Sequence, residues 1–217
     1  VTMLLTASAG TAAGPVDTDW TSYNGTVNGQ RYSPLDQINV QNVASLTEVC
    51  RLQVDDSGTF QAGLIQIDGT LYLTNARDTL AVDATNCTLR WRNVYTPEQA
   101  EVYQINRGVA FANGKLFRGT PDSRLLAIDA ATGKTLWKQQ VGDPAQGELF
   151  SSVPAIWQGL LIAGAAGSDW GIRGRIMAYE QESGREVWRF YTIPRGKETG
   201  AETWTERDSA RYGGGGS

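Results

Sequence analysis

The sequence of 217 residues contains no histidine, which excludes catalytic triads, zinc sites and general bases that depend on an imidazole. Its two cysteines, Cys50 and Cys87, are too few for a four-thiolate zinc or iron–sulfur site within this chain. Lys and Arg number 19 against 23 Asp and Glu, so the chain lacks the basic surface typical of proteins that bind nucleic acid or anionic membranes. No apolar run reaches the roughly 18 residues of a membrane-spanning helix.

The beginning of the sequence resembles part of an export signal. Residues 1–13 are mostly apolar and end in small residues of the A-x-A type, although the basic start of a signal peptide is missing. We therefore expect residues 1–18 to be a clipped signal peptide, with a disordered tail as the alternative, and a protein that is periplasmic or otherwise exported. In an oxidising compartment Cys50 and Cys87 are expected to form a disulfide, and buried free thiols are the alternative. The final GGGGS fits an engineered linker or a natural glycine stretch equally well.

Three copies of one unit organise the middle of the chain, each with an alanine, an acidic residue, a turn and a tryptophan. The copies occupy residues 80–91, 126–137 and 177–188. A second short strand pattern precedes them, at residues 69–74, 114–119 and 159–164. Strand-rich repeats of roughly 40 to 50 residues are typical of propeller blades, and no segment keeps the periodicity of a helical solenoid. The sequence therefore predicts an all-β partial β-propeller of about four four-stranded blades.

The tryptophans that end the units, Trp91, Trp137 and Trp188, are expected to build the scaffold. A large flat side chain at a fixed blade position packs against the neighbouring blade. Propellers protect their sheet edges by closing into a ring, and about four blades do not complete a large one. We therefore interpret residues 19–217 as one part of a propeller domain in a longer chain.

Four motifs carry a family resemblance. The repeat A-x-D-x-x-T-G-x-x-x-W, intact at residues 127–137, resembles the tryptophan-docking motif of the dehydrogenases that depend on pyrroloquinoline quinone (PQQ), which are eight-bladed quinoprotein propellers. Residues 19–25 with 31–39 are similar to the N-terminal signature of that family, Asn-Arg-Gly-Val at 106–109 to its cofactor-contacting segment, and residues 167–174 to its metal-binding loop. The match covers roughly residues 19–217, the N-terminal half of such a propeller.

The resemblance implies a role for seven residues. Arg107 falls on the arginine that reaches the quinone oxygens and carboxylates of PQQ, and Asp169 takes the place of the acidic calcium ligand. The other cofactor contacts implied by the resemblance are Gln61, Ser151, Ala166, Gly167 and Ser168. No catalytic residue falls within this chain, because the family's catalytic aspartate, stacking tryptophan, second metal ligand and second arginine follow the glycine stretch. We therefore expect this chain alone to be inactive.

Departures from the family pattern bear on substrate and metal. Glu101 and Val102 stand where the methanol-oxidising branch has adjacent cysteines, which argues against that branch and against methanol as substrate. Asp169 replaces the commoner Glu, which is one methylene longer. Without the resemblance, Asp169 would be interpreted as a turn residue making an Asx hydrogen bond, and Arg107 as part of a buried structural ion pair.

The resemblance implies an enzyme that uses PQQ and Ca²⁺ to oxidise an alcohol, polyol or sugar by hydride transfer to the quinone, with cytochrome c or a quinone as electron acceptor. A lanthanide in place of Ca²⁺ is compatible with the sequence. The main alternative is a non-catalytic PQQ-like propeller that serves as a protein-interaction scaffold. A sugar-binding propeller that uses Trp20, Trp170 or Trp204 as stacking platforms is a third hypothesis. Nucleotide binding is disfavoured, because a strand rather than a helix follows the glycines of residues 164–174.

Overall fold

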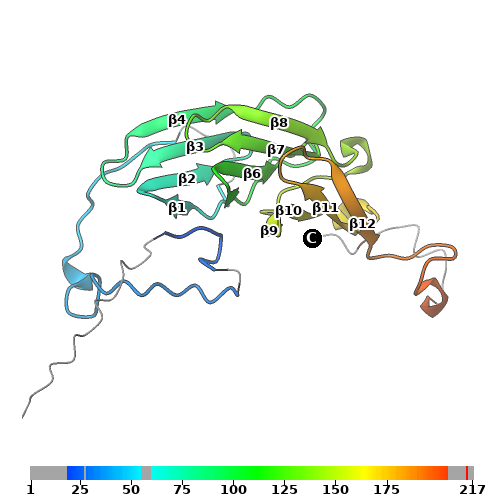
Figure 1. The fold of residues 1–217 in the computed structure, drawn as a ribbon, viewed down its shortest axis with the longest axis horizontal. Coiled ribbons are helices and arrows are strands. Elements are labelled where there is room, and N and C mark those ends of the chain that lie inside the picture. Colours follow the sequence, from blue (N-terminus) through cyan, green and yellow to red (C-terminus); the bar gives the residue numbers. More distant parts are fainter. Residues whose placement is uncertain (1–18, 27, 55–59, 205–213, 215–217) are drawn as a thin grey trace, which may run out of the picture.

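The computed structural model describes residues 19–26, 28–54, 60–204 and 214, and its strands form three four-stranded antiparallel sheets (Figure 1). The first sheet comprises β1 (Ile65–Ile67), β2 (Thr70–Thr74), β3 (Asp78–Asp83) and β4 (Leu89–Val94). The second comprises β5 (Ala110–Ala112), β6 (Lys115–Gly119), β7 (Arg124–Asp129) and β8 (Thr135–Gln140). The third comprises β9 (Ala155–Trp157), β10 (Leu160–Gly164), β11 (Arg175–Glu180) and β12 (Glu186–Tyr191).

The described helices are single 3₁₀ turns, and none is long or apolar enough to cross a membrane. They are η1 (Val43–Ser45), η2 (Pro144–Gln146), η3 (Ser168–Trp170) and η4 (Ala201–Thr203). Residues 1–18 and most of the final GGGGS, to which the export and linker interpretations apply, lie outside the described residues.

Each sheet is a meander, in which strands that follow one another in sequence are also neighbours in the sheet. A two-residue turn joins the first two strands of each sheet, and both of its residues have positive φ. These turns are Asp68-Gly69, Asn113-Gly114 and Gln158-Gly159. Positive φ at both central positions defines the type I′ turn, whose twist matches that of the flanking strands. The strand patterns predicted at the start of each unit are therefore β-hairpins.

The repeated tryptophans fasten each sheet to the next. Trp91 of β4 donates an indole hydrogen bond to the carbonyl of Ala130 (3.0 Å), and its ring lies against Gly133 in the turn between β7 and β8. Trp137 of β8 packs in the same way one sheet further on, against Gly184. The scaffold role predicted for these tryptophans is thus confirmed for both interfaces between described sheets.

The apolar core lies between the sheets. One cluster joins the first and second sheets and includes Tyr72, Leu116, Leu126 and Ile128. The other joins the second and third sheets and includes Phe117, Leu125, Leu161 and Tyr179. In Figure 1 the sheets follow one another along an arc, with β4 and β8 on its outer side. The prediction of an all-β partial propeller is confirmed, with three complete sheets among the described residues.

The segment ahead of β1 is attached to the first sheet by hydrogen bonds and by a disulfide. Trp20 exchanges two backbone hydrogen bonds with Gln66 of β1 (2.9 and 3.0 Å). Cys50 forms the predicted disulfide with Cys87, and the two Cα atoms are 5.7 Å apart. Cys87 lies in the turn between β3 and β4, so the covalent bond ties this otherwise exposed segment to the first sheet.

Candidate cofactor site

Three segments meet along the inner edges of the sheets, just ahead of β1, β5 and β9. The Gly63 N–H donates to the carbonyl of Arg107 (3.1 Å), and the Arg107 N–H donates to the carbonyl of Ser151 (2.9 Å). This backbone ladder places Arg107 and Ser151 on adjacent segments, and it places the exposed Gln61 two residues before the ladder begins. Three of the predicted cofactor contacts therefore belong to one continuous edge.

The side chains of Arg107 and Ser151 also meet. The Arg107 guanidinium is exposed and donates a hydrogen bond from Nη1 to Oγ of Ser151 at 3.5 Å, whereas Ser151 is buried. No carboxylate of a described residue pairs with Arg107, so the structure offers no partner there for the structural ion pair considered above. A guanidinium with free donors suits the oxygens of an anionic ligand, because its planar fork binds carboxylates in pairs.

Asn106 is a functional candidate that the sequence did not single out by itself. Its side chain is buried and accepts hydrogen bonds from Thr74 Oγ1 (2.6 Å) and the Gly108 N–H (2.9 Å), while its Nδ2 donates to the carbonyl of Gly119 (2.9 Å). Its place in the Asn-Arg-Gly motif is the sequence signal that could have identified it. The motif does not reveal its hydrogen-bond partners Thr74 and Gly119, which lie in other strands. Gly108 has φ of +126°, and a Cβ there would lie 2.7 Å from the Gly63 carbonyl oxygen, so the turn requires glycine.

The loop between β10 and β11 holds the other predicted site residues. Ala166 exchanges two backbone hydrogen bonds with Leu149 (2.9 and 3.0 Å), two residues before Ser151. Gly167 has φ of +130°, and a Cβ there would lie 2.2 Å from the carbonyl oxygen of Gly147, so only glycine fits. Ala166 and Gly167 are buried. The loop is thus continuous with the ladder that carries Arg107.

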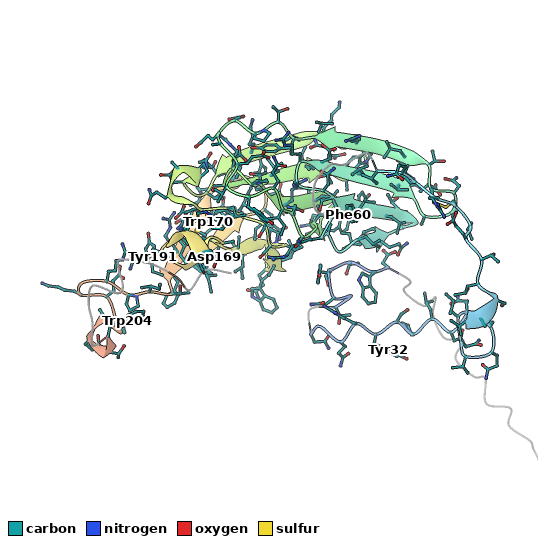
Figure 2. The ribbon with its side chains drawn as sticks, turned by 180° about the vertical axis from the view of Figure 1, so that it is seen from behind. Tyr32, Phe60, Asp169, Trp170, Tyr191 and Trp204 are labelled. Atoms are coloured by element: carbon teal, nitrogen blue, oxygen red, sulfur yellow. A yellow bond between two sulfur atoms is a disulfide. The ribbon has the colours of Figure 1, made fainter. Side chains whose placement is uncertain are left out.

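Asp169 lies in η3, and its side chain is exposed beside Trp170 at the third sheet (Figure 2). Ser168, which opens η3, is exposed as well. No described residue donates a hydrogen bond to the Asp169 carboxylate, so the Asx turn considered as an alternative does not form within the described part of the chain. Asp169 therefore presents a carboxylate that is free to bind a cation.

A buried ion pair closes the base of this loop. Arg175, the first residue of β11, pairs with the carboxylate of Glu148 through both of its terminal nitrogens, and the Asp143 N–H donates to Glu148 Oε2 (2.7 Å). Burial by itself raises the pKa of the Glu148 carboxyl, but the bonds from Arg175 and from the Asp143 backbone hold that pKa below its ordinary value. The Glu148 carboxylate is therefore ionised at neutral pH, and its ion pair with Arg175 anchors the end of the loop at β11 to the segment that precedes Leu149.

The segment before Asn106 packs onto the same loop. The rings of Tyr103 and Trp170 are 6.5 Å apart between centroids, and Val102 packs against a small cluster that includes Leu149 and Ala166. Glu101 pairs with Arg77 at 2.5 Å and accepts a hydrogen bond from Gln104 (2.9 Å). The positions aligned with the family's adjacent cysteines thus hold an ion pair and a packed valine. Tyr103, Arg77, Gln104 and Leu149 received no role from the sequence.

The donor set fits an anionic cofactor better than it defines a complete metal site. Arg107 and Ser151 offer a guanidinium and a hydroxyl on one edge, and Gln61 offers an amide two residues before Gly63, which bonds to Arg107. Asp169 offers a single carboxylate, whereas Ca²⁺ takes six to eight oxygen ligands. The described residues contain no group of three or more Asp, Glu, Cys or His side chains that could hold a metal ion. Further metal ligands would have to come from outside the described residues.

The fold defines a β-propeller whose blades are joined by tryptophan docking and whose inner edge carries the candidate site. The family model described as "Glucose/ethanol/alcohol dehydrogenase, beta-propeller domain", of the PQQ family, matches residues 20–216. The chain belongs to this family of quinoprotein dehydrogenases.

Two curated relatives and one solved structure illustrate the relationship. The quinohemoprotein alcohol dehydrogenase ADH IIB of Pseudomonas putida is 36% identical over 215 residues, which cover 91% of this chain and 31% of the relative. The lanthanide-dependent methanol dehydrogenase of Methylacidiphilum fumariolicum is 31% identical over 206 residues, which cover 90% of this chain and 33% of the relative. The structure of the quinohemoprotein alcohol dehydrogenase ADHIIG from Pseudomonas putida HK5 matches with a TM-score of 0.82 and 33% identity, over 90% of this chain and 31% of that one. The chain spans about a third of the length of these proteins.

Proposed function

We propose that this chain is the N-terminal part of an exported PQQ- and Ca²⁺-dependent dehydrogenase that oxidises alcohols, polyols or sugars by hydride transfer to the quinone. The observation that carries the proposal is the meeting of Arg107 and Ser151 on the inner edge of a family propeller. Two relatives are named as alcohol and methanol dehydrogenases, which favours an alcohol as substrate. The disulfide between Cys50 and Cys87 favours an oxidising compartment and therefore export.

Each residue of the site has a defined task in this proposal. The bound quinone supplies an electrophilic carbon that accepts hydride from the alcohol carbon. Arg107 binds anionic oxygens of the cofactor and Ser151 contributes a hydroxyl to the same edge, while the amide of Gln61 makes a further polar contact. Ala166, Gly167 and Ser168 present backbone and small side chains that allow the flat cofactor to approach closely.

Asp169 contributes one carboxylate to the metal, which is Ca²⁺ or a lanthanide. A divalent or trivalent cation withdraws electron density from an oxygen that it binds, and Asp169 would hold it at the loop. Because the described residues supply one free carboxylate there, the remaining ligands and the base that takes the hydroxyl proton would lie elsewhere in the complete protein. Electrons would leave to a cytochrome or quinone acceptor.

Dye-linked alcohol oxidation by the protein encoded in the complete reading frame tests the proposal. We expect activity that requires added PQQ and Ca²⁺, and we expect Asp169→Ala to abolish it. Asp36→Ala is the control, because Asp36 is an exposed aspartate outside the sheets. Arg107→Ala should weaken PQQ binding measured by cofactor fluorescence, with or without turnover. A wild-type protein that neither binds PQQ nor oxidises any alcohol, polyol or sugar would overturn the proposal.

A further inference from the structure

We propose that Asn106 and Thr74 are positioning residues that hold Arg107 ready to bind the cofactor. This inference rests on the proposed function, because it concerns the affinity of the same edge for PQQ. Neither side chain reaches the exposed edge: Thr74 is fully buried and Asn106 is 1% exposed. They act on Arg107 through the backbone that flanks it.

The Asn106 amide joins three segments of two sheets. Its Oδ1 accepts from Thr74 Oγ1 at the end of β2 and from the N–H of Gly108, and its Nδ2 donates to the carbonyl of Gly119 at the end of β6. A buried amide with these bonds in place has one preferred orientation, because leaving a buried polar group unpaired is costly. The amide therefore fixes the backbone on both sides of Arg107.

Hydrogen bonds from the segments ahead of β1 and β9 also hold the Arg107 backbone. Its N–H donates to the Ser151 carbonyl and its carbonyl accepts from the Gly63 N–H, so the neighbouring sheets contribute one bond each. In contrast, its side chain makes one long hydrogen bond, to Ser151, among the described residues. The arrangement is a rigid backbone that presents a guanidinium with unused donors, and preorganisation of this kind lowers the entropy lost on binding.

Arg118 supports the network from the interior. It is fully buried, and its Nε donates to the same Gly119 carbonyl (3.2 Å) that accepts from Asn106. Its terminal nitrogens donate to the Thr79 hydroxyl and to the carbonyls of Asn75, Ala76 and Asp78. These partners belong to the first sheet and to the turn between β2 and β3, whereas Arg118 belongs to the second sheet. The Gly119 carbonyl is thus a fixed point between the two sheets, and the Asn106 amide is anchored to it.

Thr74 is the residue to replace, because a substitution there can remove one hydrogen bond and leave the shape of the side chain almost unchanged. Thr74→Val keeps a branched side chain and deletes the hydroxyl that donates to Asn106. Thr70→Val is the matched control: Thr70 lies on the same strand and the same buried face, and its hydroxyl accepts a hydrogen bond from Arg90 (2.6 Å) rather than contacting the Asn106 amide. Both variants delete one buried hydroxyl from β2, so a purely structural effect should be similar in the two.

The experiment is a titration of the complete protein, freed of cofactor, with PQQ in the presence of Ca²⁺. We expect Thr74→Val to raise the dissociation constant for PQQ roughly three- to tenfold, the equivalent of one lost hydrogen bond, and Thr70→Val to leave it within about twofold. Thr74→Ser, which restores the hydroxyl, should recover the wild-type value. Urea unfolding of each apoprotein measures stability separately from affinity.

The outcomes separate this inference from the proposed function. Equal dissociation constants for the Thr74 and Thr70 variants, with wild-type protein that binds PQQ normally, overturn the positioning role and leave the proposed function standing. Wild-type protein that does not bind PQQ overturns both. If Thr74→Val does not fold, Asn106→Asp serves instead, because it keeps the shape and turns the Nδ2 donor into an acceptor facing the Gly119 carbonyl. An unchanged PQQ affinity in that variant also overturns the inference.

Discussion

Replacement of Gly133 by alanine isolates the contribution of tryptophan docking to stability. Gly133 and Gly114 have the same backbone conformation, with φ of +72° at both positions. A Cβ on Gly133 would lie 2.6 Å from the ring of Trp91, whereas a Cβ on Gly114 would meet no atom within 4 Å. Gly114→Ala therefore measures the cost of backbone strain alone, and Gly133→Ala measures strain together with the collision.

The magnitudes follow from these two components. An alanine held in the left-handed conformation costs about 1–2 kcal/mol, so Gly114→Ala should lower the free energy of unfolding by that amount. Forcing an extra methyl into a packed contact costs a further ~1–3 kcal/mol. Gly133→Ala should therefore cost about 2–5 kcal/mol, since the Trp91 ring is also held by its hydrogen bond to Ala130 and has little freedom to withdraw.

Urea unfolding of both variants, followed by far-ultraviolet circular dichroism, measures the difference. A double-mutant cycle sharpens it: in a Trp91→Leu background the ring is gone, and Gly133→Ala should then cost no more than Gly114→Ala. Equal losses for the two glycine variants in the presence of Trp91 would refute the reasoning, because they would mean that the turn is not a docking surface for the ring.

Two further predictions concern the disulfide and the buried ion pair. Reduction of the bond between Cys50 and Cys87, which closes a loop of about 38 residues, should lower the free energy of unfolding by about 3–4 kcal/mol, and an unchanged urea midpoint with reductant would contradict this. Because the folded-state pKa of Glu148 lies below its ordinary value of 4.5, the stability that this carboxylate contributes is present above pH 4.5 and is lost as pH falls through the lower folded-state pKa. Glu148→Gln should make the free energy of unfolding less dependent on pH in this acidic range. It should also lower that free energy by about 3–5 kcal/mol at pH 7, because it leaves Arg175 unpaired. A pH profile parallel to that of the wild type would contradict the role given to Glu148.

The repeated scaffold could be predicted from sequence because its determinants are local. Dipeptides such as Asn113-Gly114 predict the type I′ turns. The alternation of apolar and polar residues, bounded by turn residues, predicts the strands. The docking of Trp91 and Trp137 also follows from the sequence. Each tryptophan has the same position in its repeat, so it packs against the same turn of the next blade. The disulfide followed from composition and from the suspected compartment, without any knowledge of geometry.

The candidate site was only partly predictable, because its geometry depends on contacts between sheets. The motifs around Arg107 and Asp169 indicated two candidate segments, and the structure joins the Arg107 segment to Ser151. The partners of Asn106 did not follow from them: Thr74 is 32 residues away, and Gly119 ends a different strand. The contact between Tyr103 and Trp170 likewise joins two loops that no local pattern relates. Such pairings arise only once the blades are packed.

The docking tryptophans and the candidate site thus lie at opposite edges of the same sheets. The tryptophans dock beside the outermost strands, while the ladder through Gly63, Arg107 and Ser151 crosses the inner edges. A hydrogen bond weakens steeply once its angle falls below about 120°, so a rotation of one sheet against the next would weaken this ladder. The Asn106 and Arg118 network resists that rotation near the inner edge. We therefore expect the strain of Gly133→Ala to be absorbed at the outer edge, with reduced stability and a PQQ affinity within about twofold of the wild type, whereas Thr74→Val should change the affinity at the inner edge.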